Sequence, residues 1–293
     1  MNFNKYYSIY PSHFKLDGGA MFGIVPKPLW SKKIAADELN RIEMNCRMFL
    51  IQTKSKNIII DLGVGDYHGE KFDKRFGIKE NFNPIANVLE KNLNISCHEI
   101  TDIIVTHLHF DHVGGLGTED GHCPLFPNAT LHLHANHFEY SLNPTPRDIG
   151  SFHKEYFEPL VNWYEQKNQI HWLNDKSDKI LHDQDYELSF KVSHGHTPFQ
   201  VLPFDEKIIY MGDLLPTSHH LNIAWTMGYD LHPGQTALER AEIYDWIIQR
   251  DLILVFDHDK DFWGAKIHKK DKFKYGFDET LQSSSNIFEQ HKF

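Results

Sequence analysis

Residues 106–115, Thr-His-Leu-His-Phe-Asp-His-Val-Gly-Gly, decide which fold and which chemistry are expected of this chain. Four candidate metal ligands fall within six positions of this stretch: His107, His109, Asp111 and His112. Because alternate side chains of an extended segment point the same way, the first three are expected to share one side of the chain. His112 falls on the other side, from which it can reach a second ion.

The sequence around this motif places it on a turn that leaves a buried strand. Residues 102–105 (Asp-Ile-Ile-Val) are mostly apolar, and Gly114-Gly115 can take backbone angles that other residues resist. Imidazoles suit zinc, copper, iron or nickel, and the carboxylate extends the choice toward harder ions. A histidine-rich surface loop is the alternative, since the chain has 21 His. That alternative explains the carboxylate and the glycine pair poorly.

The composition bounds the class of protein. A chain of 293 residues is long enough for a sizeable core, and a single domain over residues 1–293 is expected. The net charge of −10 argues against a nucleic-acid partner. No stretch approaches the roughly 18 apolar residues of a membrane span, and no signal-peptide pattern is evident. Three widely spaced cysteines, Cys46, Cys97 and Cys123, favour reduced thiols in a cytoplasmic protein.

Apolar patterns divide the rest of the chain into strands and helices. Strands are expected at 7–16, 45–53, 57–63, 129–134, 170–173, 186–192, 200–203, 207–210 and 252–256. Helical spacing predicts helices at 84–93, 135–141, 152–166 and 236–250. The charged residues 66–82 are expected to form a surface insertion, and the polar tail 283–293 is expected to fray.

A second segment, residues 17–30, combines apolar side chains with three glycines and two prolines. The glycines and prolines disfavour a helix there. The apolar side chains either pack under the core or line a binding pocket, because pockets are built largely from apolar groups on loops. The pocket interpretation makes Met21, Phe22 and Trp30 candidate substrate contacts.

Polar residues near the strand ends are candidates for supporting roles. Asp61 follows the apolar run of strand 57–63, where an Asp can simply begin a turn. Three further histidines, His132, His134 and His137, have no carboxylate nearby in sequence and are expected to face solvent.

The motif His-x-His-x-Asp-His followed by Gly-Gly resembles the signature of the metallo-β-lactamase-fold hydrolases. Later residues resemble the remaining motifs of that superfamily in the same order: Gly195-His196-Thr197, Gly212-Asp213 and His258. The resemblance spans roughly residues 45–260. It implies an α/β (α+β) fold, a four-layer αββα sandwich of two mixed β-sheets with outer helices.

The resemblance also implies a site for two divalent metal ions, with zinc expected and manganese, iron or cobalt left open. One ion is assigned to His107, His109 and His196. The other ion is assigned to Asp111, His112 and His258, and Asp213 is assigned as the bridge. His194 does not match the motif and is expected to support a ligand or lie at the surface. Asp61 resembles the superfamily's acidic residue that follows an apolar strand, so it is expected to brace the metal loop as a second-shell residue. Asp111 is also expected to shuttle a proton to the leaving oxygen as a catalytic residue.

Within the superfamily, the apolar segment, Gly212–Thr217 and Trp225–Tyr229 look like the N-acyl-homoserine lactone lactonases, which are quorum-quenching enzymes. That likeness implies opening of a lactone ring in a small-molecule substrate. One departure is Pro216, because some of these lactonases have at this position a tyrosine that assists at the carbonyl. Tyr229 or His219 is then the candidate replacement.

Other activities stay open for the same metal site. A phosphotriesterase or arylesterase would use the same nucleophile and an apolar pocket. A glyoxalase II-like thioesterase would need a Lys/Arg cluster, and none is evident. A flavodiiron-like redox protein is disfavoured by His109, since that group carries an acidic ligand in the corresponding loop. A homodimer is considered for the assembly, and the sequence does not decide it.

Overall fold

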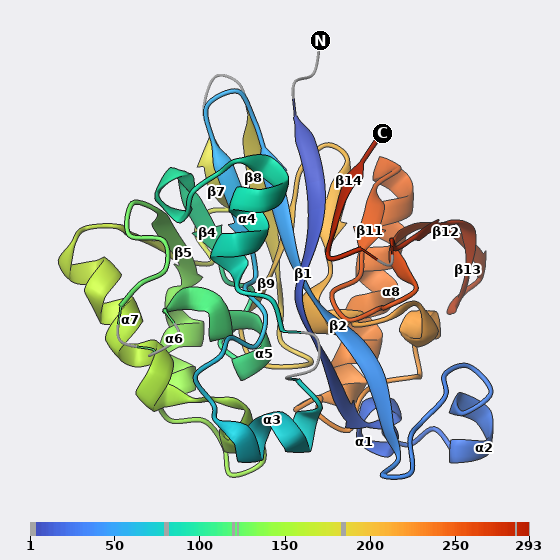
Figure 1. The fold of residues 1–293 in the computed structure, drawn as a ribbon. Coiled ribbons are helices and arrows are strands. Elements are labelled where there is room, and N and C mark those ends of the chain that lie inside the picture. The colour runs from blue at the N-terminus through green and yellow to red at the C-terminus, as the bar shows by residue number, and fades with distance from the viewer. Residues whose placement is uncertain are drawn as a thin grey trace. The chain divides into compact units, whose positions relative to one another are not determined.

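The computed structural model describes residues 4–78, 82–118, 121, 123–182, 186–284 and 286–292. These residues form two mixed β-sheets of seven strands each, flanked by helices (Figure 1). They also fall into two compact units. Unit 1 comprises the described residues of Met1–His13, Cys46–Phe190 and Ser284–Phe293, and unit 2 comprises those of Phe14–Asn45 and Lys191–Ser283. The expectation of a single domain stays a prediction.

The first sheet has the strand order β14-β1-β2-β3-β4-β5-β6. Its strands are β1 (Lys5–Asp17), β2 (Arg41–Gln52), β3 (Asn57–Ile60), β4 (Asp102–Ile104), β5 (Thr130–His134), β6 (Ile170–Leu173) and β14 (Phe288–His291). The pairs from β3 to β6 are parallel, whereas β2 is antiparallel to β3 and β14 is antiparallel to β1. Parallel strands are covered on both faces, which is why Ile58, Ile59 and Ile60 form an unbroken buried run.

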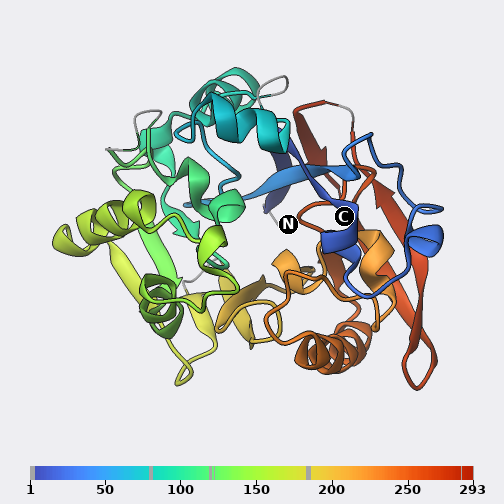
Figure 2. The ribbon, with the colours of Figure 1, turned by 90° about the horizontal axis from the view of Figure 1, so that it is seen from below.

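The second sheet has the strand order β13-β12-β11-β10-β9-β8-β7. Its strands are β7 (Lys179–His182), β8 (Glu187–Ser193), β9 (Gln200–Phe204), β10 (Ile208–Tyr210), β11 (Ile253–Val255), β12 (Phe262–Asp271) and β13 (Lys274–Gln282). β10 and β11 pair in parallel, whereas β7–β8, β9–β10, β11–β12 and β12–β13 pair antiparallel. β12 and β13 form a long ribbon toward the red end of the colour scale in Figure 2.

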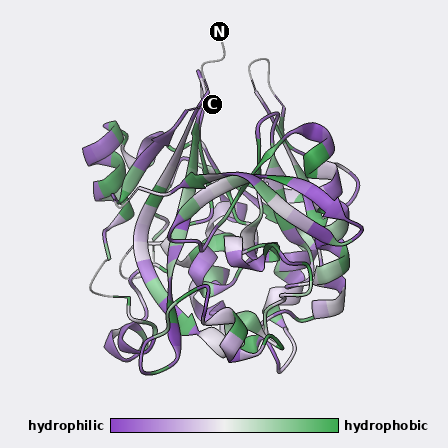
Figure 3. Cartoon of the chain, turned by 90° about the vertical axis from the view of Figure 1, so that its right-hand side faces the viewer, coloured by the Kyte–Doolittle hydropathy of each residue, from purple (hydrophilic) through white to green (hydrophobic). Residues whose placement is uncertain are grey.

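The helices lie beside these strands and complete a core in each unit. They are α1 (Gly18–Phe22), α2 (Lys27–Trp30), α3 (Glu70–Phe76), α4 (Ile85–Leu93), α5 (Phe110–Val113), α6 (Ala135–Leu142), α7 (Lys154–Gln166) and α8 (Pro233–Arg250). In unit 1, α7 packs against β5 and β6, and in unit 2, α8 packs against β12. Hydrophilic and hydrophobic residues are intermixed along the elements (Figure 3), as expected where one face meets a core. Within the described residues, no helix has the length and apolar composition needed to cross a membrane.

Most of the predicted strands and helices occur in the predicted order. Residues 17–30 are an exception, because they form helices that the sequence analysis did not expect. They contain α1 and α2, each little more than one turn long. Asp17 caps α1, because its Oδ1 accepts a hydrogen bond from the Ala20 N–H at 2.8 Å. Pro28 lies in the first turn of α2, where the missing N–H costs no helical hydrogen bond. Glycine and proline therefore limit the length of these helices without preventing them.

The prediction that the tail frays was also wrong for its described residues. Phe288–His291 forms β14 and pairs with β1. The side chain of His291 lies 2.8 Å from the hydroxyl of Ser8, measured from Nε2 to Oγ. This pairing joins residues nearly the whole chain apart in sequence, so no local pattern could reveal it. Residues 285 and 293 lie outside the described residues.

Candidate metal centre

In unit 1, the motif loop begins directly after β4 and carries four predicted ligands. His107 and His109 lie in the non-helical part of the loop, and His107 Nε2 is 3.0 Å from His109 Nδ1. Asp111 and His112 lie on the short helix α5, so the expected extended alternation holds only for the first two histidines. All four residues are buried. The histidines of this loop offer nitrogen atoms suited to a metal ion.

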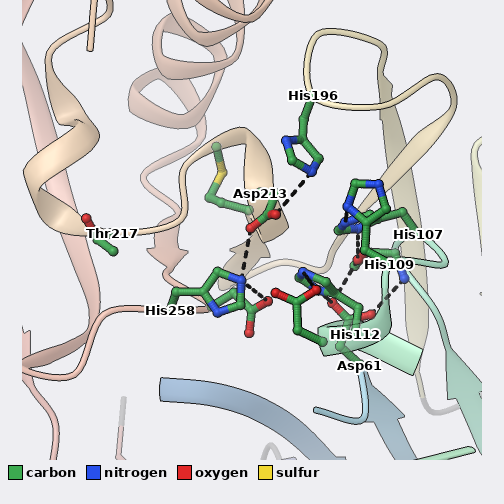
Figure 4. A network of polar contacts seen from close by, with 12 residues as sticks. Asp61, His107, His109, His112, His196, Asp213, Thr217 and His258 are labelled. Carbon is green, nitrogen blue, oxygen red and sulfur yellow. Dashed lines mark hydrogen bonds and ion pairs between the residues drawn. The ribbon is translucent and has the colours of Figure 1, made fainter. Parts of the chain in front are cut away.

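Asp61 connects two parts of the same loop. One of its carboxylate oxygens accepts a hydrogen bond from the backbone N–H of Thr106 at 2.8 Å. The other accepts from the Thr106 hydroxyl at 2.7 Å and lies 2.9 Å from Nδ1 of His112 (Figure 4). Because Nδ1 donates to this carboxylate, Nε2 of His112 carries the lone pair that can bind a metal. These contacts are those that a bracing role requires.

The glycine pair of the motif is needed for close approach, and its backbone angles are ordinary. Gly114 has φ −60° and ψ −30°, which any residue can adopt. A Cβ atom on Gly114 would lie 2.1 Å from the carbonyl carbon of Val64, and one on Gly115 would lie 2.5 Å from the Leu62 oxygen. The loop therefore packs backbone to backbone against the segment that follows β3. The prediction that Gly114 and Gly115 are needed for unusual backbone angles was therefore wrong, because the structure needs them for close packing.

The three extra histidines are buried, so the prediction that they face solvent was wrong. β5 is an interior strand between β4 and β6, which leaves neither edge exposed. His132 Nε2 lies 2.9 Å from Oδ1 of Asp102 on the neighbouring strand. His137 has a role at the motif, because its Nε2 accepts a hydrogen bond from the Leu108 N–H at 2.8 Å. His137 thus fixes the backbone between two predicted ligands, which sequence reasoning missed.

Part of the segment predicted as a surface insertion packs against the motif. The hydroxyl of Tyr67 lies 3.1 Å from Nδ1 of His153, whose ring stacks on Phe110 at 5.4 Å between centroids. Phe72 of α3 meets Phe110 edge to face at 5.2 Å. The alternation of charged and aromatic residues in this segment was the signal that sequence reasoning overlooked.

In unit 2, the carboxylate of Asp213 lies between two imidazoles (Figure 4). Its Oδ2 is 3.1 Å from Nε2 of His196, and its Oδ1 is 3.1 Å from Nε2 of His258. Nδ1 of His196 lies 3.0 Å from the Asp230 carboxylate, and Nδ1 of His258 lies 2.8 Å from the carbonyl oxygen of Asn45. Both partners of Nδ1 are acceptors, so both Nδ1 atoms carry hydrogen.

This tautomer places acceptor against acceptor at Asp213. When an imidazole is neutral and protonated at Nδ1, its Nε2 atom carries a lone pair. In both histidines this lone pair faces an anionic oxygen of Asp213. A proton or a cation between Nε2 and the carboxylate removes the repulsion. The donor set of histidine nitrogen and carboxylate oxygen is the one that zinc prefers. The residues of unit 2 therefore fit a bound divalent metal, with Asp213 able to serve one ion on each oxygen.

Unit 2 also contains polar residues near the proposed ligands whose roles the sequence did not indicate. Asp230 orients His196, although it lies 34 positions away in sequence. Asp257 accepts a hydrogen bond from the Tyr210 hydroxyl at 2.7 Å and has Oδ2 3.6 Å from His258 Nε2. His194 Nδ1 accepts from the Phe199 N–H at 3.1 Å, which gives it a structural contact of its own.

The predicted substrate contacts of unit 2 are mostly buried. Met21, Phe22 and Trp30 have relative exposures of 1%, 0% and 1%. The Phe22 ring stacks on both Trp30 and His220, at 5.3 and 4.7 Å between centroids. Of the two candidate replacements for the missing tyrosine, Tyr229 is exposed, and His219 has its pKa lowered by burial. Both stay predictions.

Two buried histidines and one partly buried histidine make folding sensitive to mild acid. Burial lowers the pKa of His220 and of His291 to about 3, and that of His68 to about 4. Because these values lie below the unfolded value of about 6.5, the unfolded chain binds the extra protons as the pH falls. Stability is therefore complete above about pH 6.5 and is lost progressively below it, by up to about 1.4 kcal/mol per pH unit for each histidine.

Urea unfolding between about pH 7 and about pH 5 measures this loss, and a free energy of unfolding that stays constant over the range would contradict it.

Comparison with known proteins places the chain in a family. The family model of the metallo-beta-lactamase superfamily matches residues 41–245. The N-acyl homoserine lactonase AttM of Agrobacterium fabrum is 25% identical over 190 residues, which cover 62% of this chain and 66% of that relative. The match thus spans slightly less than two thirds of that curated relative's length.

Solved structures share the fold over nearly the whole chain. A probable metal-dependent hydrolase from Staphylococcus aureus has a TM-score of 0.84 at 27% identity, covering 98% of this chain and 99% of that chain. AidC, a dizinc quorum-quenching lactonase solved with a hexanoyl-homoserine product, has a TM-score of 0.74 at 17% identity, covering 97% and 96%. The predicted fold class is confirmed, and at the level of the family so is the class of metal-dependent hydrolase. Since the family model covers most of its length, this chain belongs to the metallo-β-lactamase superfamily.

Proposed function

We propose that this protein is a dinuclear metal hydrolase that opens the lactone ring of N-acyl homoserine lactones. The observation that carries the proposal is the Asp213 carboxylate, each oxygen of which faces the Nε2 atom of a different histidine. A carboxylate placed in this way can bridge two ions, as in two-metal hydrolases. Membership of the superfamily supports the same site.

The proposed ligand set is the one that the order of the sequence motifs assigns. One ion would be held by His107, His109 and His196, the other by Asp111, His112 and His258, and Asp213 would be shared. When bound, divalent ions of this kind act as Lewis acids toward a carbonyl oxygen and make coordinated water acidic near neutral pH. Zinc is the proposed element, because histidine predominates among the ligands.

The protein's own residues orient this site and handle the proton. Asp61, Asp230 and the Asn45 carbonyl each accept from Nδ1 of a proposed ligand, which keeps the opposite nitrogen turned toward the ion. Asp111 is proposed to receive a proton during attack and to deliver it to the leaving alkoxide oxygen. Tyr229 or His219 is proposed to donate a hydrogen bond to the carbonyl, where Pro216 cannot.

The substrate class is supported by relatives that are similar over part or all of the chain. AttM of Agrobacterium fabrum is an N-acyl homoserine lactonase, and AidC was solved with a hexanoyl-homoserine product. We propose a small acyl lactone as the substrate of this chain as well. A ring-opening assay over lactones of several acyl lengths, run beside a thioester and a phosphotriester, tests the assignment. Turnover of the thioester or the phosphotriester without turnover of any acyl lactone would contradict it.

We propose that Met21, Phe22 and Trp30 shape the acyl pocket as a buried wall. Phe22→Ala should lower the free energy of unfolding by about 3–5 kcal/mol, because a fully buried ring is lost. It should also raise KM for long acyl chains more than for short ones, because the wall packed on the Phe22 ring would shift, and each methylene that then loses contact with that wall costs up to about 0.8 kcal/mol. KM across a chain-length series, together with urea unfolding, measures both effects.

The matched control for this prediction is Ile247→Ala in the core of unit 2, which should cost stability without changing the preference for chain length. If Phe22→Ala behaves in the same way as the control, its ring serves packing alone and the proposed pocket wall is wrong.

A further inference from the structure

Arg240 is a fully buried arginine on α8 of unit 2. Its guanidinium donates three hydrogen bonds to backbone carbonyl oxygens: from Nε to Leu214 at 2.6 Å, and from Nη1 to His220 at 3.2 Å and to Trp225 at 2.8 Å. No carboxylate of the described residues lies within ion-pair distance of it. A buried charge is costly unless its donors are well satisfied, so a position of this kind calls for a specific reason.

The three carbonyl oxygens belong to one segment, residues 214–225, which begins immediately after Asp213. On the other side, the side-chain amide of Gln200 is assigned with its oxygen toward Asp213, because the other orientation would set its NH₂ group against two N–H donors. In this assignment the oxygen accepts hydrogen bonds from the N–H groups of Asp213 at 3.1 Å and of Leu214 at 3.2 Å. The backbone at Asp213 is therefore held by Gln200 through its N–H groups and by Arg240 through the next carbonyl. The carboxylate of Asp213 extends from this fixed point toward His196 and His258 (Figure 4).

The same segment also anchors the aromatic residues near the N-terminal helices. Nε2 of His220 donates to the carbonyl oxygen of Met21 at 2.9 Å, and the His220 ring stacks on Phe22. Trp225 meets Phe22 edge to face at 5.9 Å. Arg240 thus fixes a loop that touches the predicted ligand Asp213 at one end and the Phe22 cluster further along.

We propose that Arg240 is a positioning residue for Asp213, and through it for both metal ions. The inference rests on the proposed dinuclear site and deepens it. Asp213 lies in a single-turn 3₁₀ helix, Gly212–Leu214, directly after β10, and one such turn has too few internal hydrogen bonds to fix the backbone by itself. The guanidinium supplies the missing constraint, because its planar fork of donors can meet several carbonyls at once.

Lysine cannot reproduce this arrangement. An ammonium group carries the same charge on a similar stem, but it is a compact donor that cannot span three carbonyls in fixed directions. Arg240→Lys therefore tests the geometry with the charge kept, and Arg240→Met removes charge and donors together. Arg250 is the matched control, since it lies on the same helix, is exposed, and stacks on Trp246 at 4.8 Å with no contact to the segment 214–225.

The experiment uses the full-length protein stripped of metal and titrated with zinc alone. For Arg240→Lys, the affinity for the more weakly held zinc should fall about 10–100-fold. In the zinc-loaded protein, kcat should fall by a similar factor while KM for an acyl lactone changes less than about twofold, because Arg240 acts through Asp213 and not on substrate. Arg250→Met should match the wild type in zinc affinity and in kcat.

A folded Arg240→Lys that binds both zinc ions with wild-type affinity and keeps the wild-type kcat, with only a lower melting temperature, would overturn the proposal. If Arg240→Met fails to fold, the lysine variant alone decides. Failure of the proposed function is separate, because the zinc titration does not depend on substrate. Wild-type protein that binds two zinc ions but opens no acyl lactone leaves the role of Arg240 to be decided by the zinc affinities of the variants.

Discussion

Asp213→Ala should remove at least one metal ion per chain and lower kcat/KM by about 10³-fold or more. The two oxygens of this carboxylate face two different imidazole nitrogens, at 3.1 Å each. Its removal takes a ligand from both proposed ions and leaves His196 and His258 without the anion between them. Elemental analysis of the purified variant, with a lactone assay on the same sample, measures both losses.

Asp205→Ala is the control for Asp213→Ala. Asp205 is also buried in unit 2, but its side chain accepts hydrogen bonds from Lys207 and Ile208 in the β9–β10 turn. Its loss should reduce stability and leave the metal content unchanged. An Asp213→Ala protein that retains two ions per chain and wild-type turnover would remove the bridge from the proposed site.

Asp61→Ala should weaken metal binding about 10–100-fold without removing any ligand. Asp61 accepts from the N–H and the hydroxyl of Thr106 and holds Nδ1 of His112. Without it, the His112 ring can rotate and the motif loop loses one backbone and one side-chain hydrogen bond at Thr106. Leaving buried donors unsatisfied should also lower the free energy of unfolding by about 1–3 kcal/mol for each. Zinc titration of the metal-free variant, with urea unfolding alongside, separates the two effects.

Asp102→Ala provides the matched comparison for Asp61→Ala. Asp102 is a buried carboxylate of unit 1 at the start of β4. Its Oδ1 lies 2.9 Å from Nε2 of His132, and its Oδ2 accepts a hydrogen bond from Nζ of Lys56 at 2.8 Å. Its loss should cost stability in the same way, with zinc affinity close to that of the wild type. Equal zinc affinities of the two variants would mean that Asp61 supports the fold and not the metal loop.

The proposed ligands could be selected from the sequence because much of their signal is local. Four of them lie between positions 107 and 112, and their residue types and spacing indicate metal binding directly. His196, Asp213 and His258 carried a weaker signal, in which a polar residue follows a strand, and only the order of the motifs selected them. Each of them could have been an ordinary turn residue.

The residues that orient the ligands could not be predicted in the same way. Asp230 reaches His196 across 34 positions, and His137 reaches Leu108 across 29. Both are common polar residues without a local pattern, and only the packed structure brings them to the loop. Arg240 is a further case, since an arginine in an amphipathic helix is expected on the solvent face.

The strands were predicted better than the helices near the N-terminus for a related reason. Buried strands such as Ile58–Ile60 can be recognised in the sequence as β-branched apolar runs. One-turn helices such as α1 and α2 have no room for a periodic pattern and depend on a single cap, here Asp17. β14 depends on pairing with β1 at the opposite end of the chain.

The central claim, that two metal ions act together in this chain, is tested most directly by elemental analysis of active wild-type protein. Metal content per chain should be measured while metal is progressively removed, with turnover of an acyl homoserine lactone recorded on the same samples. The proposal predicts two ions per fully active chain, and activity that falls steeply once the content drops below two. Full turnover by protein that contains a single ion per chain would contradict it.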